Sequence, residues 1–374
     1  MRIPVVVLAI LLLYPCPRVR AQVDQSRPPQ IHTYYIAADE VDWDYTPGGR
    51  SRAGFPEVGG SGNPEDLQHR KYLKAIYREY MDATFQSLKQ RPPEWEHLGI
   101  LGPVIRAEVG DTIKVIFKNR TKIMCTMHPH GLGYTKSSEG AMYADGTSGV
   151  EKKDDAVPPG ETYTYVWSVP ERSGPGPHDP SSILWMYHSH WVEPKDMNTG
   201  LIGPIIISRR GSTKPDGTPK DVDREFVTAF AIFDETESWY FETNIMHLRD
   251  YPPNLYYVPA YTPMKASDPV FWRNNLMYSI NGLIEGNLPM LTMRKGERVR
   301  WYLFSNSNED DIHAAHWHGE TVILNNMRTD TVSLTPMAMA VADMVPDNVG
   351  TWLFHCHVNE HYQGGMVAEF TVLP

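Results

Sequence analysis

Cysteine is scarce in this sequence, which contains 3 cysteines in 374 residues. Cys16 lies in an apolar leader, which leaves Cys125 and Cys356 for the rest of the chain. Two cysteines in a secreted protein can form a disulfide. Cys356, however, stands between His355 and His357, and a disulfide would remove the thiolate that a metal ion binds. We therefore expect no disulfide, and we expect Cys125 to be either a small buried hydrophobe or a spare thiol.

Long apolar runs are absent beyond the leader. The run from Val5 to Tyr14 is too short to span a bilayer. It is followed by Val19-Arg20-Ala21, which is typical of a cleavage site. We predict a signal peptide over residues 1–21, a secreted, extracellular protein, and no membrane anchor.

A basic surface is also missing, because the formal net charge is −10 with acids and bases interleaved. This balance excludes the electrostatic footprint of a nucleic-acid-binding protein. Asn119-Arg120-Thr121 is the single glycosylation sequon in the sequence. In a secreted protein, such a sequon predicts a surface loop.

Short strand-like segments recur along the chain, and they predict an all-β protein. Residues 71–88 mix aromatic and charged side chains and are compatible with a helical turn, and residues 46–64 predict a long loop. The predicted strands are residues 33–38, 98–105, 112–117, 162–167, 202–207, 226–233 and 299–304.

The order of these features repeats in the two halves of the chain. Each half begins with an acidic and aromatic element, passes a glycine turn and ends in a histidine-rich hairpin. We predict two β-sandwich domains at residues 22–210 and 222–374, joined by a breaker-rich linker at 211–221. Two unrelated β domains are the alternative.

Histidines are concentrated in four short stretches, which hold ten of the fifteen in the chain. A lone His-x-His pair is often two solvated side chains on an exposed strand. Four pairs, one of which encloses a cysteine, exceed what a zinc site needs and suit a cluster of several copper ions. The stretches are His128-Pro129-His130, His188-Ser189-His190, His313-Ala314-Ala315-His316-Trp317-His318, and His355-Cys356-His357 with His361.

Strand alternation separates two kinds of site. Residues i and i+2 of a strand face the same way, so the two imidazoles of each His-x-His point to one place, whereas Cys356 faces the other side. His313 precedes His316 by three residues and also faces away from it. We predict a blue-copper site with two imidazoles, a thiolate and an axial thioether. Its ligands are His313, Cys356, His361 and Met366. An electron can then pass along the backbone from Cys356 to its two histidine neighbours.

The four stretches resemble the signatures of multicopper oxidases, in their usual order. The flanking sequence is similar to that of the ceruloplasmin and hephaestin group, over most of the mature chain. The segments that carry this similarity are residues 34–45, 91–103, 195–196, 200–204 and 280–282.

The resemblance implies two cupredoxin-like Greek-key β-sandwich domains and four copper ions per active unit. His313, Cys356, His361 and Met366 match type 1 ligands. His128 and His316 match type 2 ligands, and type 3 ligands correspond to His130, His188, His190, His318, His355 and His357. The disulfide of ceruloplasmin-type domains near the second histidine pair is replaced here by serine, in a region that holds Ser181, Ser182 and Ser208.

The family reduces O₂ to water with electrons from a reductant, and proton relays and a reductant site are therefore expected. Glu139 or Asp145 are candidate relays, and ordinary surface acids are the alternative. Glu360 matches one acid of the ferroxidase iron site. Two other positions of that site hold Arg273, which would repel Fe²⁺, and Tyr278. Nearby acids that could substitute are Asp268, Glu285, Glu309, Asp310 and Asp311.

The expected function is oxidation of Fe²⁺ or of small phenol or amine reductants with O₂ as acceptor. A laccase-like oxidase without ferroxidase activity, a non-catalytic copper-binding protein and an interaction module are the alternatives. Each half of the chain supplies four of the eight cluster histidines, and two-domain laccases resemble this plan. In ceruloplasmin-like proteins, six such domains form a ring whose terminal domains share the cluster. The resemblance therefore implies that this two-domain chain makes the same ring as a homotrimer, with head-to-tail interfaces that close by threefold rotation and clusters between subunits.

Overall fold

The structure is a computed structural model that describes residues 27–47, 71–244, 275–306 and 312–374. Within these ranges no helix is long and apolar enough to cross a membrane. Several features predicted from the sequence lie outside the described residues. These are the signal peptide at 1–21, most of the loop at 46–64, and Asp268, Arg273, Glu309, Asp310 and Asp311.

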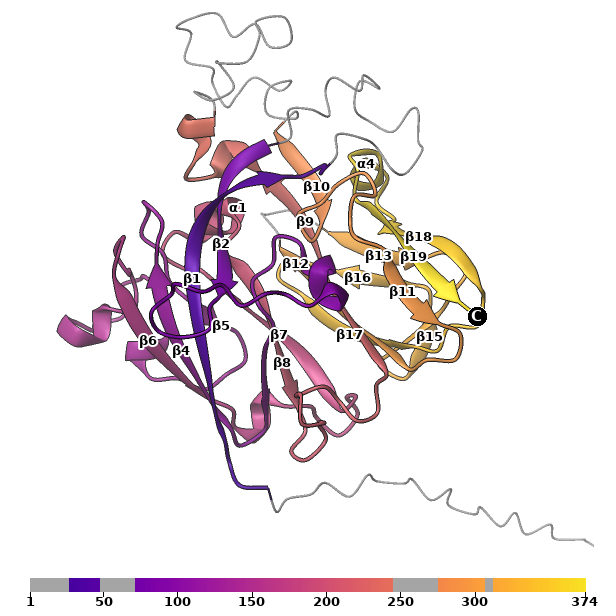
Figure 1. The fold of residues 1–374 in the computed structure, drawn as a ribbon, viewed down its shortest axis with the longest axis horizontal. Helices are drawn as coiled ribbons and strands as arrows, with labels where there is room; N and C mark the ends of the chain where they lie inside the picture. Colours follow the sequence, from indigo (N-terminus) through magenta and orange to yellow (C-terminus); the bar gives the residue numbers. More distant parts are fainter. Residues whose placement is uncertain (1–26, 48–70, 245–274, 307–311) are drawn as a thin grey trace, which may run out of the picture.

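The first half of the chain forms two four-stranded sheets, coloured indigo to magenta in Figure 1. The sheets have the strand orders β2-β1-β4-β6 and β3-β8-β7-β5. Buried side chains from both sheets share one core, which makes the pair a β-sandwich. The strands are β1 (Ile31–Asp44), β2 (Lys71–Glu79), β3 (Ile105–Glu108), β4 (Thr112–Asn119), β5 (His128–Pro129), β6 (Thr162–Ser168), β7 (Ser182–His188) and β8 (Ile202–Ser208).

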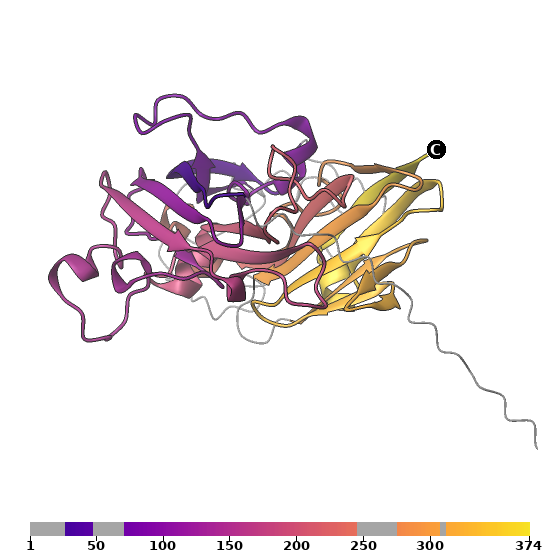
Figure 2. The same cartoon turned by 90° about the horizontal axis from the view of Figure 1, so that it is seen from below.

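The second half forms a six-stranded and a five-stranded sheet, coloured from salmon (β9) through orange to yellow beside the first half in Figures 1 and 2. Their orders are β10-β9-β12-β17-β14-β15 and β11-β19-β18-β13-β16. A second core fills the space between them. The strands are β9 (Arg224–Asp234), β10 (Leu276–Ile280), β11 (Leu291–Arg294), β12 (Val299–Asn306), β13 (His313–Trp317), β14 (Val322–Leu324), β15 (Met327–Thr329), β16 (Thr331–Leu334), β17 (Met339–Met344), β18 (Gly350–Cys356) and β19 (Val367–Leu373).

Helices are short and lie at strand ends. One α-helix in each half follows a His-x-His pair. They are α1 (Glu193–Thr199), after His188-Ser189-His190, and α4 (Asn359–Gln363), which comes after His355-Cys356-His357 and contains His361. The 3₁₀ helices are η2 (Pro93–Leu98), η3 (Lys136–Ser138), η4 (Gly149–Lys152), η5 (Glu171–Ser173) and η6 (Glu235–Glu237).

Alternating burial explains why the predicted strands form. In β4, Ile113, Val115 and Phe117 are fully buried while their neighbours are partly exposed, as the period of two requires. β9 and β12 are buried along almost their whole length and pair in parallel, which suits continuous apolar runs. The all-β prediction is confirmed.

Two local predictions were wrong. Residues 71–79 form the strand β2 rather than a helical turn, because they pair with β1 along their full length. In the predicted strand at 98–105, Leu98 ends η2, residues 99–104 form a turn followed by a bend and irregular backbone, and β3 begins at Ile105. Gly99 has a positive φ of 53°, and a Cβ there would lie 2.2 Å from the carbonyl oxygen of Asn281. The chain therefore turns closely against the second half at this point.

The sequon does not mark a surface loop, and that prediction was wrong as well. Asn119 ends β4 with a fully buried side chain. Its Nδ2 donates to the carbonyl oxygens of Ile123 at 2.7 Å and Val157 at 2.8 Å. Both amide hydrogens are therefore engaged, and the side chain is inaccessible in the folded protein.

The two halves share a third apolar core that contains side chains from β2, β8, β9 and β12. A buried ion pair lies beside it, where Lys74 of β2 donates to Glu235 of η6. Tyr45 also donates to Glu235, at 2.5 Å, and Lys74 donates to the carbonyl oxygen of Asn198. Burial lowers the pKa of Lys74 and raises that of Glu235, so each charge depends on the other half of the chain.

A polar network lies in the region where ceruloplasmin-type domains would have a disulfide. Ser182 and Ser208 lie directly opposite each other on β7 and β8. Ser182 accepts a hydrogen bond from Arg300 Nη1 at 2.8 Å and shares another with Tyr302 at 2.6 Å. Arg300 is only 2% exposed and pairs with Asp343 at 2.7 Å. The network thereby ties β7 of the first half to β12 of the second.

His97 also joins the halves. Its Nδ1 donates to the carbonyl oxygen of Glu94 at 2.9 Å, and its Nε2 accepts from the backbone N–H of Val227 at 3.1 Å. This pattern requires the neutral ring. Burial lowers the pKa of His97 to about 4.

Stability should therefore fall on acidification. The unfolded chain binds a proton at His97 near pH 6.5 and the folded chain does not until about pH 4, so stability is lost as the pH falls through this window. We expect this residue alone to lower the free energy of unfolding by up to about 3 kcal/mol across this pH window. His97→Gln keeps an acceptor for Val227 and cannot titrate. Urea unfolding at several pH values should show that the free energy of unfolding falls more steeply with acidification in the wild type than in His97→Gln. Parallel pH dependences of the two proteins would contradict the assignment.

Candidate metal centre

The pairing of β13 with β18 builds one side of the centre. Ala315 is opposite Cys356 and His316 is opposite His355. His313 is buried on one face of β13, whereas His316 is half-buried on the other. The thiol and His313 therefore face the core, and the histidines flanking the cysteine lie on the opposite face of the strand, as strand alternation predicts. On that face His357 is exposed and His355 is buried.

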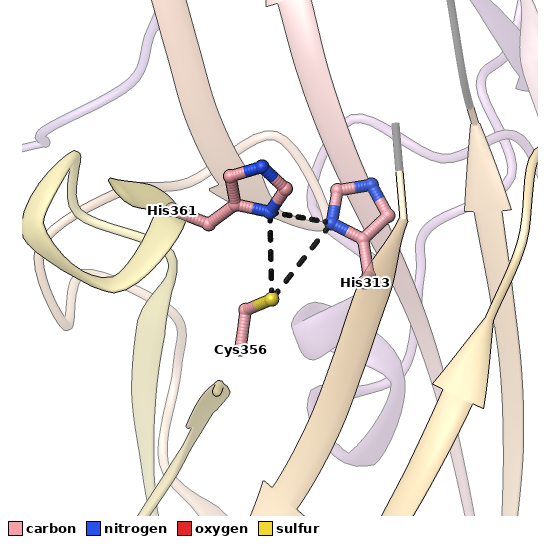
Figure 3. A group of neighbouring side chains, drawn as sticks. All are labelled: His313, Cys356 and His361. Carbon is pink, nitrogen blue, oxygen red and sulfur yellow. Dashed lines mark hydrogen bonds between the residues drawn. The ribbon is translucent and has the colours of Figure 1, made fainter. Parts of the chain in front are cut away.

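His313, Cys356 and His361 come together from β13, β18 and α4 (Figure 3). Cys356 Sγ lies 3.9 Å from His313 Nδ1 and 3.5 Å from His361 Nδ1, and the two nitrogens are 3.1 Å apart. Met366 is fully buried in the same core, and its carbonyl oxygen accepts from the N–H of Cys356 at 3.1 Å.

These three side chains fit one metal ion. Nitrogen and sulfur ligands with bond lengths of about 2.0–2.3 Å surround an ion at mutual separations of about 3.3–3.9 Å, close to those observed. Burial lowers the pKa of His313 to about 3 and also lowers that of His361. Both rings are therefore neutral, which is the form that binds metal. One thiolate with two imidazoles is the in-plane donor set of a blue-copper site.

Four further histidines of the second half form what we call the carboxy-terminal set: His316, His318, His355 and His357. One ring nitrogen from each of the first three lies within 4.8 Å of the others. His316 Nδ1 donates to the carbonyl oxygen of Asp330 at 2.9 Å, and His355 Nδ1 donates to that of Cys356 at 2.8 Å. Because Nδ1 of each of these two rings is engaged in this way, Nε2 is the nitrogen left for a metal.

The amino-terminal set has the same construction and consists of His128, His130, His188 and His190. His128 Nδ1 donates to the carbonyl oxygen of Glu139 at 2.6 Å, and His188 Nδ1 donates to that of Ser189 at 2.9 Å. His130 Nε2 and His188 Nε2 are 3.0 Å apart, as are His318 Nε2 and His355 Nε2 in the other set. Burial lowers the pKa of His130 to about 4.

The two sets do not meet within the chain. Among the described residues, which include all eight histidines, no hydrogen bond or ring contact joins one set to the other. His357 is exposed and His316, His318, His128, His130 and His190 are partly exposed. Each set therefore includes imidazoles that solvent reaches.

The candidate proton relays lie in an ionic cluster beside the amino-terminal set. The carboxylate of Glu139 pairs with Lys136 at 2.6 Å, and Asp145 pairs with Lys136 at 3.3 Å and with Lys152 at 2.8 Å. Hydrogen bonds from Lys152 and Thr147 hold the pKa of Asp145 well below its usual range. Glu139 is nearer to the histidines, because its carbonyl oxygen holds the ring of His128.

Glu360 and Tyr278 lie beside the thiolate site. Glu360 is exposed at the start of α4, and its Oε1 accepts from the hydroxyl of Tyr278 at 3.5 Å. The ring of Tyr278 packs against His361 with centroids 5.5 Å apart. The backbone N–H of Glu285, one of the possible substitute acids, donates to the carbonyl oxygen of Gly365 at 2.8 Å.

Sequence reasoning missed a group of polar residues behind the amino-terminal set. Thr126, Ser189 and Asp196 are fully buried and hydrogen-bonded to one another around His190. The signal that could have found them is the match between His188-Ser189-His190 and His355-Cys356-His357.

The chain is similar to known proteins over most of its length. Two family models, both described as multicopper oxidase, match residues 98–212 and 257–374. The chain is 41% identical to human ferroxidase HEPHL1 over 353 residues, which cover 91% of this chain and 29% of that protein. It is 40% identical to mouse hephaestin over 357 residues (91% and 28%) and 39% identical to human ceruloplasmin over 371 residues (93% and 33%). The chain thus spans about a third of the length of these relatives.

Solved structures support the fold. A crystal structure of a multicopper oxidase superposes with a TM-score of 0.56 at 19% identity, over 91% of this chain and 89% of the other. The blue copper oxidase from Nitrosomonas europaea gives a TM-score of 0.55 at 18% identity, over 92% and 86%. The predicted cupredoxin-like all-β fold class is confirmed.

Replacing the thiol should separate the two kinds of site. We expect Cys356→Ser to abolish the intense visible thiolate-to-copper band when Cu²⁺ is added to metal-free protein, because serine cannot supply the soft anionic ligand. Copper held by the histidine sets should remain. Absorption and the copper-to-protein ratio measure both effects. Cys125→Ser is the matched control and should keep the band, so a band in Cys356→Ser or its loss in the control contradicts the assignment.

Proposed function

Because this chain belongs to the multicopper oxidase family, we propose that it couples one-electron oxidation of a reductant to the four-electron reduction of O₂ to water. The observation that carries the proposal is the arrangement around Cys356, with His313 of β13 and His361 of α4 beside its thiol and His355 and His357 as its chain neighbours. A store of copper has no need of a buried thiolate site next to a histidine cluster.

Four copper ions per active unit are proposed, and they would supply the one-electron redox chemistry when bound. The type 1 ligands are His313, Cys356, His361 and Met366, and those of type 2 are His128 and His316. The type 3 pair is assigned to His130, His188, His190, His318, His355 and His357. Cys356 provides a covalent path from the reductant side to His355 and His357. Four such electrons, four protons and one O₂ give two water molecules, and Glu139 or Asp145 is the proposed proton relay.

The proposed reductant is Fe²⁺, with small phenols or amines as the alternative class. The relatives named ferroxidase support Fe²⁺, and the exposed carboxylate of Glu360 next to His361 supplies a hard oxygen ligand of the kind that suits such a cation. Tyr278, which packs on His361, favours instead an aromatic donor. A laccase-like oxidase without ferroxidase activity is therefore the second candidate.

Glu360→Gln distinguishes the two candidates. If Fe²⁺ binds at this carboxylate, we expect kcat/KM for Fe²⁺ to fall by at least about tenfold, while oxidation of a bulky phenol, which needs no ligand here, stays unchanged. O₂ uptake measures both reactions. Glu369→Gln on β19 is the control. A wild type that oxidises Fe²⁺ no faster than outer-sphere donors would remove the ferroxidase assignment.

A homotrimer is proposed as the active unit. The separation of the amino-terminal and carboxy-terminal sets within one chain supports it, because a head-to-tail interface can bring one copy of each set together.

We further propose domain limits at 22–210 and 222–374, supported by sheets that end with β8 and begin again at β9. Secretion is proposed from the apolar run at 5–14.

Mixing two inactive variants tests the shared cluster. His130→Ala/His188→Ala loses the amino-terminal set, and His318→Ala/His355→Ala loses the carboxy-terminal set. When the two chains are expressed together, a cluster between subunits can combine the intact set of each, so that about a quarter of the clusters are complete for random assembly. We expect O₂ uptake at that level.

Each variant expressed alone is the control and should be inactive. Sedimentation of the copper-loaded wild type should give three chains per particle. Absence of activity in the mixture, or a fully active wild-type monomer, would contradict the proposal.

A further inference from the structure

The two halves repeat one backbone arrangement around their central residue. His128 is opposite His188 on β5 and β7, just as His316 is opposite His355 on β13 and β18. The N–H of Thr126 donates to Ser189 Oγ at 3.0 Å, and the N–H of Ala314 donates to Cys356 Sγ at 3.4 Å. Ser189 therefore occupies the position of the cysteine.

The segments that follow also match. The N–H of Ser189 donates to the carbonyl oxygen of Leu201 at 3.1 Å, and the N–H of Leu201 donates to that of Asp196 at 3.2 Å. In the second half, Cys356 donates to Met366 at 3.1 Å and Met366 donates to His361 at 2.9 Å. Asp196 thus takes the place of His361, and Leu201 takes the place of Met366. Cys125, three residues before His128, corresponds to His313.

The first half therefore holds a hydrogen-bonded centre at the position of the thiolate site. Ser189 Oγ donates to Asp196 Oδ2 at 2.7 Å, where the second half has Cys356 Sγ and His361 Nδ1 at 3.5 Å. A serine hydroxyl and a leucine side chain cannot replace a thiolate and a thioether as soft ligands. Burial raises the pKa of the Cys125 thiol, which keeps it protonated and unsuited to metal binding.

We propose that Asp196 is a positioning residue for His190. The hydrogen bonds of this centre hold the backbone around His190, as the ligand set around Cys356 holds the corresponding backbone in the second half. The inference rests on the proposed function only in that His190 is taken as a copper ligand. Asp196 reaches His190 from both sides along the chain, through Ser189 before it and Trp191 and Val192 after it.

The contacts of the Asp196 carboxylate explain how it acts. Its Oδ2 accepts from the hydroxyl of Ser189 and from the backbone N–H groups of Trp191 at 2.8 Å and Val192 at 3.0 Å. Its Oδ1 accepts from Trp239 Nε1 at 2.7 Å. Four donors converge on a side chain with no exposure to solvent, and an ionised carboxylate accepts from all of them.

The surroundings keep this backbone segment in one conformation. The N–H of His190 donates to Thr126 Oγ1 at 2.9 Å, and the hydroxyl of Thr126 donates to the carbonyl oxygen of Gly140 at 2.6 Å. The rings of Trp191 and Trp239 stack with centroids 4.9 Å apart and an interplanar angle of 20°. With its neighbours and its own N–H held, His190 has little freedom besides rotation of its side chain.

Asp196→Asn tests the role, because asparagine keeps the shape but not the charge and presents its NH₂ to one of the four donors. In metal-free protein we expect the amides of Trp191 and Val192 to exchange hydrogen at least about tenfold faster, as read by mass spectrometry with fragmentation. In copper-loaded protein, we expect the visible band of the Cys356 site at wild-type intensity and a loss of the copper bound beyond it.

Two further variants make the result decisive. Asp39→Asn alters another buried carboxylate of the first half, which accepts from Tyr80 at 2.5 Å, and it should change neither the exchange at Trp191 nor the copper content. Ser189→Ala removes only the link from Asp196 to Thr126. It should speed exchange at the Thr126 amide and cause a smaller copper loss even if Asp196→Asn does not fold.

Unchanged exchange at Trp191 and Val192 in Asp196→Asn would overturn the proposal, as would full copper content despite faster exchange, or an equal effect of Asp39→Asn. A wild type that binds no copper beyond the Cys356 site would instead contradict the proposed function. The exchange comparison in metal-free protein would still decide the positioning role.

Discussion

The register between β13 and β18 is the constraint on which the site depends. With Ala315 opposite Cys356 and His316 opposite His355, the thiol faces the core while its two neighbours lie on the opposite face of the strand. A slip by one residue would exchange the two faces and turn the thiol away from His313. The surrounding aromatic core resists such a slip, since Trp317, Phe354 and Trp301 pack against one another with centroids 5.0–5.4 Å apart.

The union of the two halves is the second constraint. An apolar core joins them, and charged side chains outside this core are paired across the boundary, as in Lys74 with Glu235 and Arg106 with Glu225. Removing one partner of such a pair leaves a buried charge uncompensated, at a cost of about 3–5 kcal/mol. These pairs therefore favour one relative orientation of the halves, which in turn fixes where each histidine set points.

The repeated backbone arrangement shows how one structural motif carries two chemistries. Around Cys356 the motif gathers soft ligands and imidazoles, and around Ser189 it gathers hydrogen-bond donors on a carboxylate. The backbone hydrogen bonds are the same in both halves. What differs is side-chain chemistry at four positions, and that difference separates a candidate redox site from a support for neighbouring ligands.

The sequence by itself determined the strand content, the four histidine stretches and the opposite facing of Cys356 and its neighbours, because alternation along a strand is a local property. It did not determine β2, because its aromatic and charged residues were compatible with a helical turn and only the pairing with β1 makes the segment a strand. Nor did it reveal that Asn119 is buried, since a sequon carries no information about what packs on it. The separation of the two histidine sets and the convergence of four donors on Asp196 were decided only by the tertiary structure, because both depend on contacts between segments far apart in the chain.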